Sequence, residues 1–430
     1  MNTAKPLRPE TLSIHAGSAP DPVTGARIPP VHQAVSYVFQ NAEQAANLFH
    51  LKETGNIYGR LTNPTTAALE EKLAALEGGV GAVCTASGLA SHILALSALM
   101  QSGDHVIASD MIYGGTYNQF KNVFPHSFGW GASFADHTRP ESFKAALKPN
   151  TKAIFIESLA NPAGAIPDLQ AIAAVAREAG IPLIVDNTMA TPALCQPFKF
   201  GANIVTHSTT KFLNGHCNAM GGAVIDGGNF DWRAQGDKFP LLTQIQPTYG
   251  EKSLCDAFGN KAFTVHNRTG LRDLGIGQQP INAWLTLVGM ETLFLRMQRH
   301  CDNAQTVAEY LLKHAKVGWV SYSGLPASPY QPMARKYMNG KGGAVFTFGI
   351  KGGYAAGVKF VESLKLFSHV AHIGDTRSMV IHPASTTHSQ LTPDARKAGG
   401  VGDDVVRLSI GIEHIDDIID DIEQALAALN

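Results

Sequence analysis

Short apolar runs alternate with amphipathic stretches through the middle of the chain. The runs are rich in β-branched residues, which is typical of buried strands, and they cover residues 81–85, 105–109, 152–157, 181–185 and 202–206. Between them, apolar positions recur at helical spacing, as in the alanine-rich segment 169–179. This rhythm of strand, helix and strand predicts a mostly parallel sheet with helices on both faces.

One helix is predicted with both of its ends. Pro64 suits a first helical position, Asn63 or Thr62 can cap it, and Gly78 and Gly79 follow the last apolar position. The apolar stripe between these signals consists of Leu69, Leu73 and Leu76. The segment therefore predicts a helix of about four turns.

The two ends of the chain differ from this middle part. Residues 1–60 are rich in proline and have little periodicity, which predicts an extended arm that must lie on another surface. Residues 281–314 have the apolar spacing of one long helix, and we place a domain boundary inside it, near residue 288. The expected division is an arm (1–60), a larger domain (61–288) and a C-terminal α+β domain (289–430).

The composition is typical of a globular protein and does not suggest a nucleic-acid-binding or membrane protein. The chain has 430 residues, enough for two sizeable domains, and is 44% hydrophobic and 16% charged, as in ordinary globular proteins. Its net charge of −1 gives no sign of a nucleic-acid or membrane partner. The five cysteines are widely spaced and form no CxxC pair, which favours a reducing compartment. With no signal-peptide or transmembrane pattern, we expect a cytoplasmic protein that acts on small molecules.

One stretch places a lysine among hydroxyls at the end of a predicted strand. Lys211 directly follows Ser208, Thr209 and Thr210, which themselves follow the run at 202–206. Pockets of α/β sheets lie at such strand ends, and a lysine in a pocket can bind a phosphorylated aldehyde as a Schiff base. The same residues also fit an ordinary strand-end lysine beside a polar loop.

Asp186 favours the first interpretation. It ends the run at 181–185 and stands 25 residues before Lys211, a separation that leaves room for one loop and one more strand. A parallel sheet would bring both side chains to the same edge. A carboxylate that faces a pyridine nitrogen keeps that nitrogen protonated, and the protonated ring is the better electron sink.

A phosphate-binding helix start is expected upstream. Ser87, Gly88 and Leu89 stand where the run at 81–85 turns into a helical stretch at 90–101. Backbone N–H groups at such a position bind phosphate, and a glycine lets the ligand come close. A competing dinucleotide-binding motif is incomplete, because Cys84 occupies the place of its third glycine; a nicotinamide dehydrogenase is therefore only a distant alternative.

Two pairs of histidines and one cysteine suggest other kinds of site. The pairs His369 with His372 and His382 with His388 have no third ligand at a suitable spacing, so no metal is expected. Cys217 has no histidine at a motif spacing and is interpreted as a buried thiol instead of a nucleophile.

The segments VDNT and HSTTK, which contain Asp186 and Lys211, resemble the pyridoxal-phosphate signature of the Cys/Met metabolism family of transsulfuration enzymes. The resemblance runs from about residue 12 to the C-terminus. It implies the aspartate-aminotransferase fold (fold type I) and pyridoxal 5'-phosphate as the cofactor. The cofactor contacts that it implies are Ser87, Gly88, Leu89, Tyr113, Asn161, Asp186, Ser208, Thr210 and Lys211, with Tyr58 and Arg60 from a neighbouring subunit.

The resemblance also implies individual roles. Lys211 would carry the cofactor, and Tyr113 of the YGGT segment would stack on its ring. Arg407 of VRLSIGIE would clamp the substrate α-carboxylate, a task that suits a planar bidentate donor. The expected catalytic residues are Lys211, Tyr113 and Tyr58. The expected substrate contacts are Arg407, Ser378 and Asn161.

Within the family, the chain resembles the O-acetylhomoserine sulfhydrylase branch. The lysine and the carboxylate-binding arginine are 196 residues apart, more than in the lyases, and the added material includes GNFDW, KFPLLTQ and LRDLG. Gly115 points the same way, because methionine γ-lyases have a cysteine there. The resemblance implies γ-replacement: O-acetyl-L-homoserine and sulfide give L-homocysteine and acetate, in methionine biosynthesis.

Other activities of the same family stay open as alternatives. They are a γ-lyase acting on methionine or cystathionine, and a sulfhydrylase that uses methanethiol, O-succinylhomoserine or O-acetylserine. The expected assembly is a homotetramer built from dimers with shared active sites.

Overall fold

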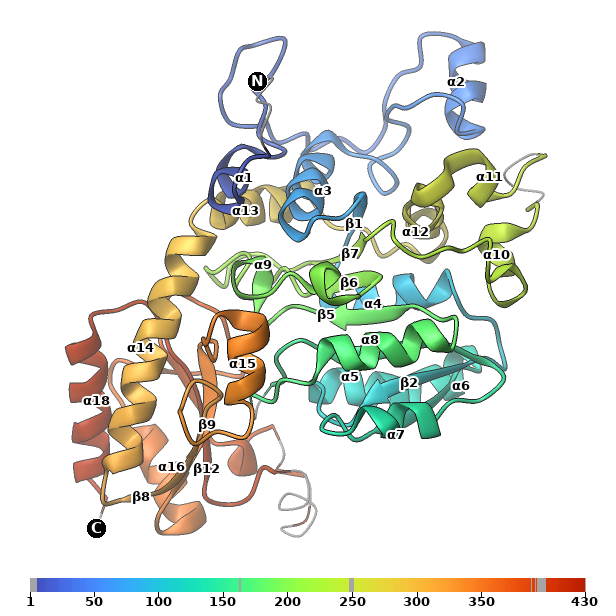
Figure 1. The fold of residues 1–430 in the computed structure, drawn as a ribbon. Helices are drawn as coiled ribbons and strands as arrows, with labels where there is room; N and C mark the ends of the chain where they lie inside the picture. The colour runs from blue at the N-terminus through green and yellow to red at the C-terminus, as the bar shows by residue number, and fades with distance from the viewer. Residues whose placement is uncertain are drawn as a thin grey trace.

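A seven-stranded sheet forms the centre of the larger part of the molecule (Figure 1). The computed structural model describes residues 6–161, 164–246, 251–387, 389, 390, 392 and 400–429. The strand order is β1-β7-β6-β5-β4-β2-β3, and only β7 runs against its neighbours, so the predicted mostly parallel sheet is confirmed. The strands are β1 (Gly81–Thr85), β2 (His105–Ser109), β3 (Gly131–Ala135), β4 (Thr151–Glu157), β5 (Leu183–Asp186), β6 (Ile204–His207) and β7 (Gly222–Asp226).

The central strands are buried along their whole length. Every residue of β5 and β6 is buried, because other parts of the chain cover both faces of the sheet. This explains why the apolar residues of these strands follow one another directly, as in Leu183–Val185, instead of alternating with polar residues. The helices that pack on the strands are α3 (Pro64–Glu77), α4 (Gly88–Ser97), α8 (Leu169–Glu178) and α12 (Ala262–Leu274).

Helix α3 has the ends predicted from the sequence. The Asn63 side chain accepts hydrogen bonds from the N–H groups of Thr65 and Thr66, and Pro64 takes the first helical position. Gly78 ends the helix in the left-handed region, with φ of 83°. The stripe of Leu69, Leu73 and Leu76 is fully buried.

Shorter elements complete the larger part. They are α5 (Gly114–Asn118), η1 (Gln119–Val123), α6 (Phe124–Phe128), α7 (Pro140–Ala145), α9 (Thr191–Leu194), η2 (Pro197–Phe200), η3 (Gly236–Lys238), α10 (Pro240–Thr243), α11 (Leu254–Phe258), η5 (Gly259–Lys261) and α13 (Pro280–Met290). Across the described ranges, no helix is long and apolar enough to cross a membrane.

A second sheet organises the C-terminal part. Its order is β10-β11-β12-β9-β8, antiparallel except for the pair β10 and β11, as expected for a smaller α+β unit. Its strands are β8 (Val317–Ser321), β9 (Val345–Ile350), β10 (Ser368–His369), β11 (Met379–Ile381) and β12 (Val405–Ser409). The helices around it are α14 (Leu293–Lys313), α15 (Gln331–Met338), α16 (Gly353–Ser363), the short η6 (Pro383–Ser385) and α18 (Ile415–Ala427). The domain boundary near residue 288 stays a prediction.

The expected single helix over residues 281–314 is wrong. The chain forms α13 and α14, which are separated by Glu291 and Thr292. At the break, the carbonyl of Gly289 accepts hydrogen bonds from the side chains of Thr292 (3.4 Å) and Arg296 (2.8 Å). These side chains pair a carbonyl that a continuous helix would have paired with a backbone N–H.

The structure also differs from the sequence predictions at the edges of the two sheets and in the N-terminal arm. Strands β3 and β8 were not expected, because both are partly exposed edge strands with weak patterns (GASFA and VGWVS). The arm is not extended throughout, because it contains α1 (Pro9–His15) and α2 (Ala42–Phe49). Helix α1 packs against α3, while the arm also exposes Val23, Val35 and Val38.

Candidate active site

The site is a cavity of about 230 Å³ at the carboxyl ends of the parallel strands. The start of α4, the loop after β2, the ends of β4 and β5, and the segment after β6 supply its wall. The C-terminal part closes it with residues 371–373, which follow β10, and with Arg407 of β12. Ligand sites of open parallel sheets lie at this edge, so the fold itself locates the site.

Lys211 lies four residues beyond the end of β6 and points into the cavity. Its Nζ is 3.0 Å from Nδ1 of His372. Burial, together with the positive charge of Arg407, lowers the pKa of Lys211 from 10.5 to about 8. Burial, with Lys211 next, lowers the pKa of His372 to about 4, so a neutral imidazole accepts the hydrogen bond of the lysine amine.

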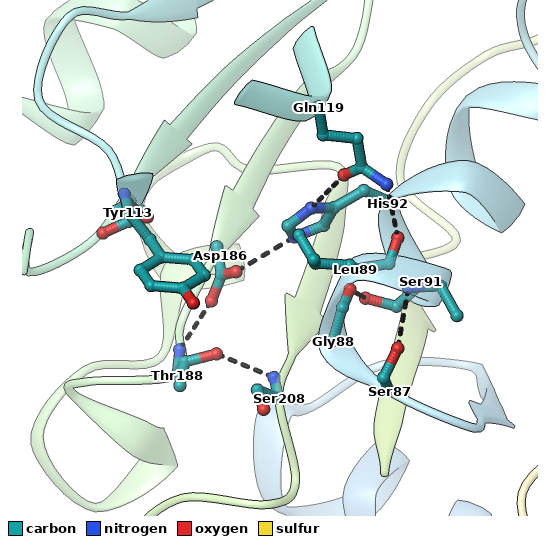
Figure 2. A network of polar contacts seen from close by, with 12 residues as sticks. Ser87, Gly88, Leu89, Ser91, His92, Tyr113, Gln119, Asp186, Thr188 and Ser208 are labelled. Atoms are coloured by element: carbon teal, nitrogen blue, oxygen red, sulfur yellow. Dashed lines mark hydrogen bonds and ion pairs between the residues drawn. The ribbon is translucent and has the colours of Figure 1, made fainter. Parts of the chain in front are cut away.

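Asp186 ends β5, and its carboxyl group contacts His92 and Thr188 (Figure 2). Its Oδ2 lies 3.1 Å from Nε2 of His92, and its Oδ1 accepts a hydrogen bond from the N–H of Thr188 at 2.9 Å. Burial alone would raise the pKa of Asp186, but the hydrogen bond and charge of His92 and the hydrogen bonds of Thr188 outweigh it and lower that pKa. Asp186 is therefore an anion.

Glu157 ends the adjacent strand β4 and pairs in register with Asp186. Its carboxyl accepts hydrogen bonds from the N–H of Tyr113 at 2.6 Å and of Asn161 at 3.4 Å. Burial and the charge of Asp186 raise the pKa of Glu157 well above its ordinary value. Of these two neighbouring carboxyl groups, one is charged and the other neutral.

The start of α4 forms a polar cradle on another wall of the cavity. Ser87 caps the helix by accepting a hydrogen bond from the N–H of Ala90 at 3.2 Å. Gly88 lies against Ser208, and a Cβ on Gly88 would stand 2.7 Å from the Cβ of Ser208. Only glycine permits this contact between the helix start and the segment that leads to Lys211.

Arg407 is largely buried and faces the cavity from the second sheet. Its guanidinium donates to Oδ1 of Asn161 at 3.4 Å and to the carbonyl of His372 at 3.2 Å. Burial lowers the pKa of Arg407 to about 10, and the residue stays a cation at neutral pH. Tyr113, the residue before α5, lines the same cavity with half of its surface exposed.

The structure brings most of the predicted site residues together, but not all. Tyr58 and Arg60 line a different hollow, with the Arg60 guanidinium 5.1 Å from the centre of the Tyr58 ring. Ser378 is fully buried in the C-terminal part, where it bonds to Glu413 and to the N–H of Gly411. Within the described part of the chain, these three residues are not in the wall of the Lys211 cavity.

The cavity residues that were not predicted as site residues include His92, Glu157, Thr188 and His372. Glu157 ends the strand expected at 152–157, and Thr188 belongs to the segment VDNT that also contains Asp186. Both residues therefore stand close to positions that the sequence had singled out. A signal for His92 was its place as the only ionisable residue of the apolar helix GLASHILALS. For His372 the sequence offered only its pairing with His369, a spacing that suggests a metal ligand.

The interpretation of Cys217 as a buried thiol is wrong. Cys217 is exposed and has a φ of 54°, because it occupies a left-handed turn position in the loop before β7. Among the described residues, the grouping that could hold a metal is Asp110, Asp136 and His137, away from the cavity. His388 lies outside the described residues.

The chain belongs to the family of Cys/Met metabolism PLP-dependent enzymes, whose model matches residues 10–427. It is 50% identical to O-acetyl-L-homoserine sulfhydrylase 1 of Thermus thermophilus, over 98% of this chain and all of the relative. It is 44% identical to the homocysteine synthase of Schizosaccharomyces pombe, over 97% of both chains. A crystal structure from Campylobacter jejuni, called an O-acetylhomoserine (thiol)-lyase, has a TM-score of 0.94 and 38% identity, over 98% of this chain and all of that one; it contains N'-pyridoxyl-lysine-5'-monophosphate.

The residues of the cavity fit pyridoxal phosphate, the cofactor of this family. The cradle at Gly88, which a Cβ would fill, offers helix N–H groups and hydroxyls that suit a phosphate. The anionic Asp186 suits a protonated ring nitrogen, and Lys211 suits an aldehyde. The cavity thus offers a group for the phosphate, one for the ring nitrogen and one for the aldehyde.

The lowered pKa of Lys211 gives a testable pH dependence. An amine adds to an aldehyde only when it is neutral, so the rate of covalent uptake of pyridoxal phosphate by the cofactor-free protein is expected to rise with a midpoint near pH 8 and to level off above that pH. Rapid mixing followed by absorbance measures the rate across pH. Nα-acetyl-lysine, mixed under the same conditions, corrects for the titration of the cofactor. A midpoint near the ordinary lysine value of 10.5 would contradict the assigned environment of Lys211.

Proposed function

We propose that this protein is an O-acetylhomoserine sulfhydrylase (O-acetylhomoserine aminocarboxypropyltransferase). It replaces the acetate of O-acetyl-L-homoserine with sulfide and yields L-homocysteine for methionine biosynthesis. The observation that carries the proposal is the cavity in which the amine of Lys211, with a pKa of about 8, lies between Arg407 and the cofactor-binding residues. The names and full-length coverage of the relatives support the choice within the family.

We assign the steps to the chain's own residues. Arg407 binds the α-carboxylate and, with Asn161, orients the substrate. The amine of Lys211 would take the proton from Cα and then one from Cβ; acetate leaves Cγ, sulfide adds there, and the lysine ammonium returns protons to Cβ and Cα. Bound pyridoxal phosphate supplies the electron sink for these steps. His372 can hold the freed lysine amine, because it contacts that amine in the free state.

The remaining assigned residues act on the cofactor. The start of α4 with Ser87, Gly88 and Leu89 holds the phosphate, helped by the hydroxyls of Ser208 and Thr210. Tyr113 would cover one face of the ring, and Asp186 would hold the ring nitrogen. Ser378 contributes at most through the backbone around it, because its hydroxyl is already paired with Glu413 and Gly411.

Product analysis tests this function against its alternatives. The purified enzyme is loaded with pyridoxal phosphate and given O-acetyl-L-homoserine and sulfide, and homocysteine and α-ketobutyrate are measured together. Homocysteine as the main product supports γ-replacement. If α-ketobutyrate dominates, or if methionine or cystathionine is cleaved faster, the protein is a γ-lyase. Parallel assays with methanethiol, O-succinylhomoserine and O-acetylserine rank the donors and acceptors.

We also propose a homotetramer built from dimers with shared sites, in the cytoplasm. Tyr58 and Arg60 lie at the end of the arm and outside their own chain's cavity, which supports a role in the site of a neighbouring subunit. The exposed valines of the arm support its packing on another surface. The five cysteines are all unpaired, which supports a reducing compartment.

Mixed subunits test the shared site. Arg60→Ala and Lys211→Ala are each expected to be nearly inactive, and equal amounts that exchange freely should recover about one quarter of the wild-type activity. The reason is that half of the dimers are hybrids, in which one site carries both defects and the other carries neither.

A matched control for this experiment mixes Lys211→Ala with Asp186→Asn. Both residues belong to the cavity of one chain, so every site of a hybrid keeps one defect and no recovery is expected. If the Arg60→Ala mixture also stays inactive despite demonstrated exchange, Arg60 does not act across the subunit boundary.

A further inference from the structure

Helix α4 connects two parts of the cofactor site: its start forms the polar cradle at Gly88, and its residue His92 contacts Asp186. Gly88 and His92 are four residues apart in α4, so they share a face of the helix. The helix start forms the cradle, and one turn further His92 lies 3.1 Å from Asp186 (Figure 2). His92 is 3% exposed and packs edge-on against Phe155, with ring centroids 4.9 Å apart.

The hydrogen bonds around His92 determine where its protons are. The carbonyl of Leu89 can only accept, so the atom of Gln119 that faces it at 3.0 Å is the amide nitrogen. The amide oxygen of Gln119 then faces Nδ1 of His92 at 3.2 Å, and Nδ1 must carry a hydrogen. The carboxylate of Asp186 likewise requires a hydrogen on Nε2.

We propose that His92 is an imidazolium that holds Asp186 as an oriented anion, and that it thereby sets the protonation of the cofactor's ring nitrogen. His92 is thus a positioning residue that acts through Asp186 without touching the substrate. The inference rests on the proposed role of Asp186. In this arrangement, the carboxylate of Asp186 contacts two cations, His92 and the protonated ring of the cofactor. Removal of His92 therefore changes the pKa of Asp186 and, through it, that of the ring nitrogen.

The other groups around His92 do not supply this charge. On η1, Gln119 and Phe120 face it, and on β4 Phe155 faces it; all three are uncharged. Glu157, the second carboxyl group near Asp186, has a raised pKa and stays neutral. The ion pair of His92 and Asp186 is therefore isolated in this wall of the cavity.

The first test is the binding of pyridoxal phosphate to cofactor-free His92→Gln across pH. Without His92 the buried Asp186 loses its neighbouring cation, so the pKa of Asp186 rises. The pH below which the affinity for pyridoxal phosphate falls is therefore expected to move toward neutral pH. At pH 7 the Kd should rise about ten- to hundredfold. Should His92→Gln fail to fold, Gln119→Leu removes the acceptor of Nδ1–H and should move the profile in the same direction by less.

His105 provides a matched control. It is also a buried histidine with both ring nitrogens bonded, to the hydroxyls of Thr151 and Ser133, each at 2.9 Å. Among the residues that the structure describes, its ring nitrogens contact no carboxylate, and it lies at the opposite end of β2 from the cavity. His105→Gln should therefore lower the melting temperature at most, and leave the pH profile of cofactor binding in place.

A double-mutant cycle separates this role from a structural one. If His92 acts through Asp186, then His92→Gln should add little to the loss in affinity already caused by Asp186→Asn. If the two losses multiply, or if His92→Gln leaves the pH profile unmoved, the proposal is overturned. An Asp186→Asn variant with normal affinity and turnover would instead refute the role of Asp186 itself. Neutron diffraction of the cofactor-free protein should find hydrogen on both ring nitrogens of His92; a single one would refute the imidazolium.

Discussion

Lys211→Ala is expected to lower kcat for homocysteine formation by a factor of about 10³ to 10⁴ or more, because it removes both the covalent attachment of the cofactor and the proton-transfer group. Steady-state assays measure the loss. The absorption band of lysine-bound pyridoxal phosphate should disappear, and borohydride should no longer fix the cofactor to the protein. Circular dichroism and thermal unfolding should stay close to the wild type, because Lys211 forms no part of the hydrophobic core.

A surface lysine gives the control for this substitution. Lys144 forms an exposed ion pair with Glu178 at 2.9 Å, so Lys144→Ala should keep the absorption band and full turnover. If Lys211→Ala retains the band, another lysine carries the cofactor and the assignment of the whole cavity is wrong.

Asp186→Asn is expected to lower kcat by about 10²- to 10⁴-fold. The neutral amide no longer favours the protonated ring, so the electron sink weakens. The loss should fall mainly on the chemical step, which a substrate kinetic isotope effect at Cα would reveal as a larger value in the variant than in the wild type. Turnover close to normal would remove Asp186 from the site.

Glu157 is the informative comparison for Asp186. Both carboxyl groups end neighbouring strands and pair in register, but the raised pKa of Glu157 makes it neutral. Glu157→Gln removes no charge and should cost much less than Asp186→Asn. Equal losses would mean that both carboxyl groups share the charge.

The sequence determined the local elements and the edge at which the chemistry lies. Asn63 and Pro64 set a helix start through contacts within a few residues, and continuous apolar runs identify strands that are buried on both faces. Because parallel strands end at one edge, the positions of Asp186 and Lys211 at strand ends were enough to expect them in one cavity. Family resemblance added Arg407, which no local pattern identifies.

Only the tertiary structure decided which groups meet and which of them carry charge. The contacts of His92 with Asp186 and of Lys211 with His372 join residues 94 and 161 positions apart. The pKa values of Lys211, Asp186 and Glu157 depend on burial and on such neighbours, which local sequence does not encode. The break between α13 and α14 likewise depends on Arg296, whose guanidinium also binds the carbonyl of Phe212, 84 residues away. Short-range patterns therefore gave the elements, and long-range packing set the electrostatics of the site.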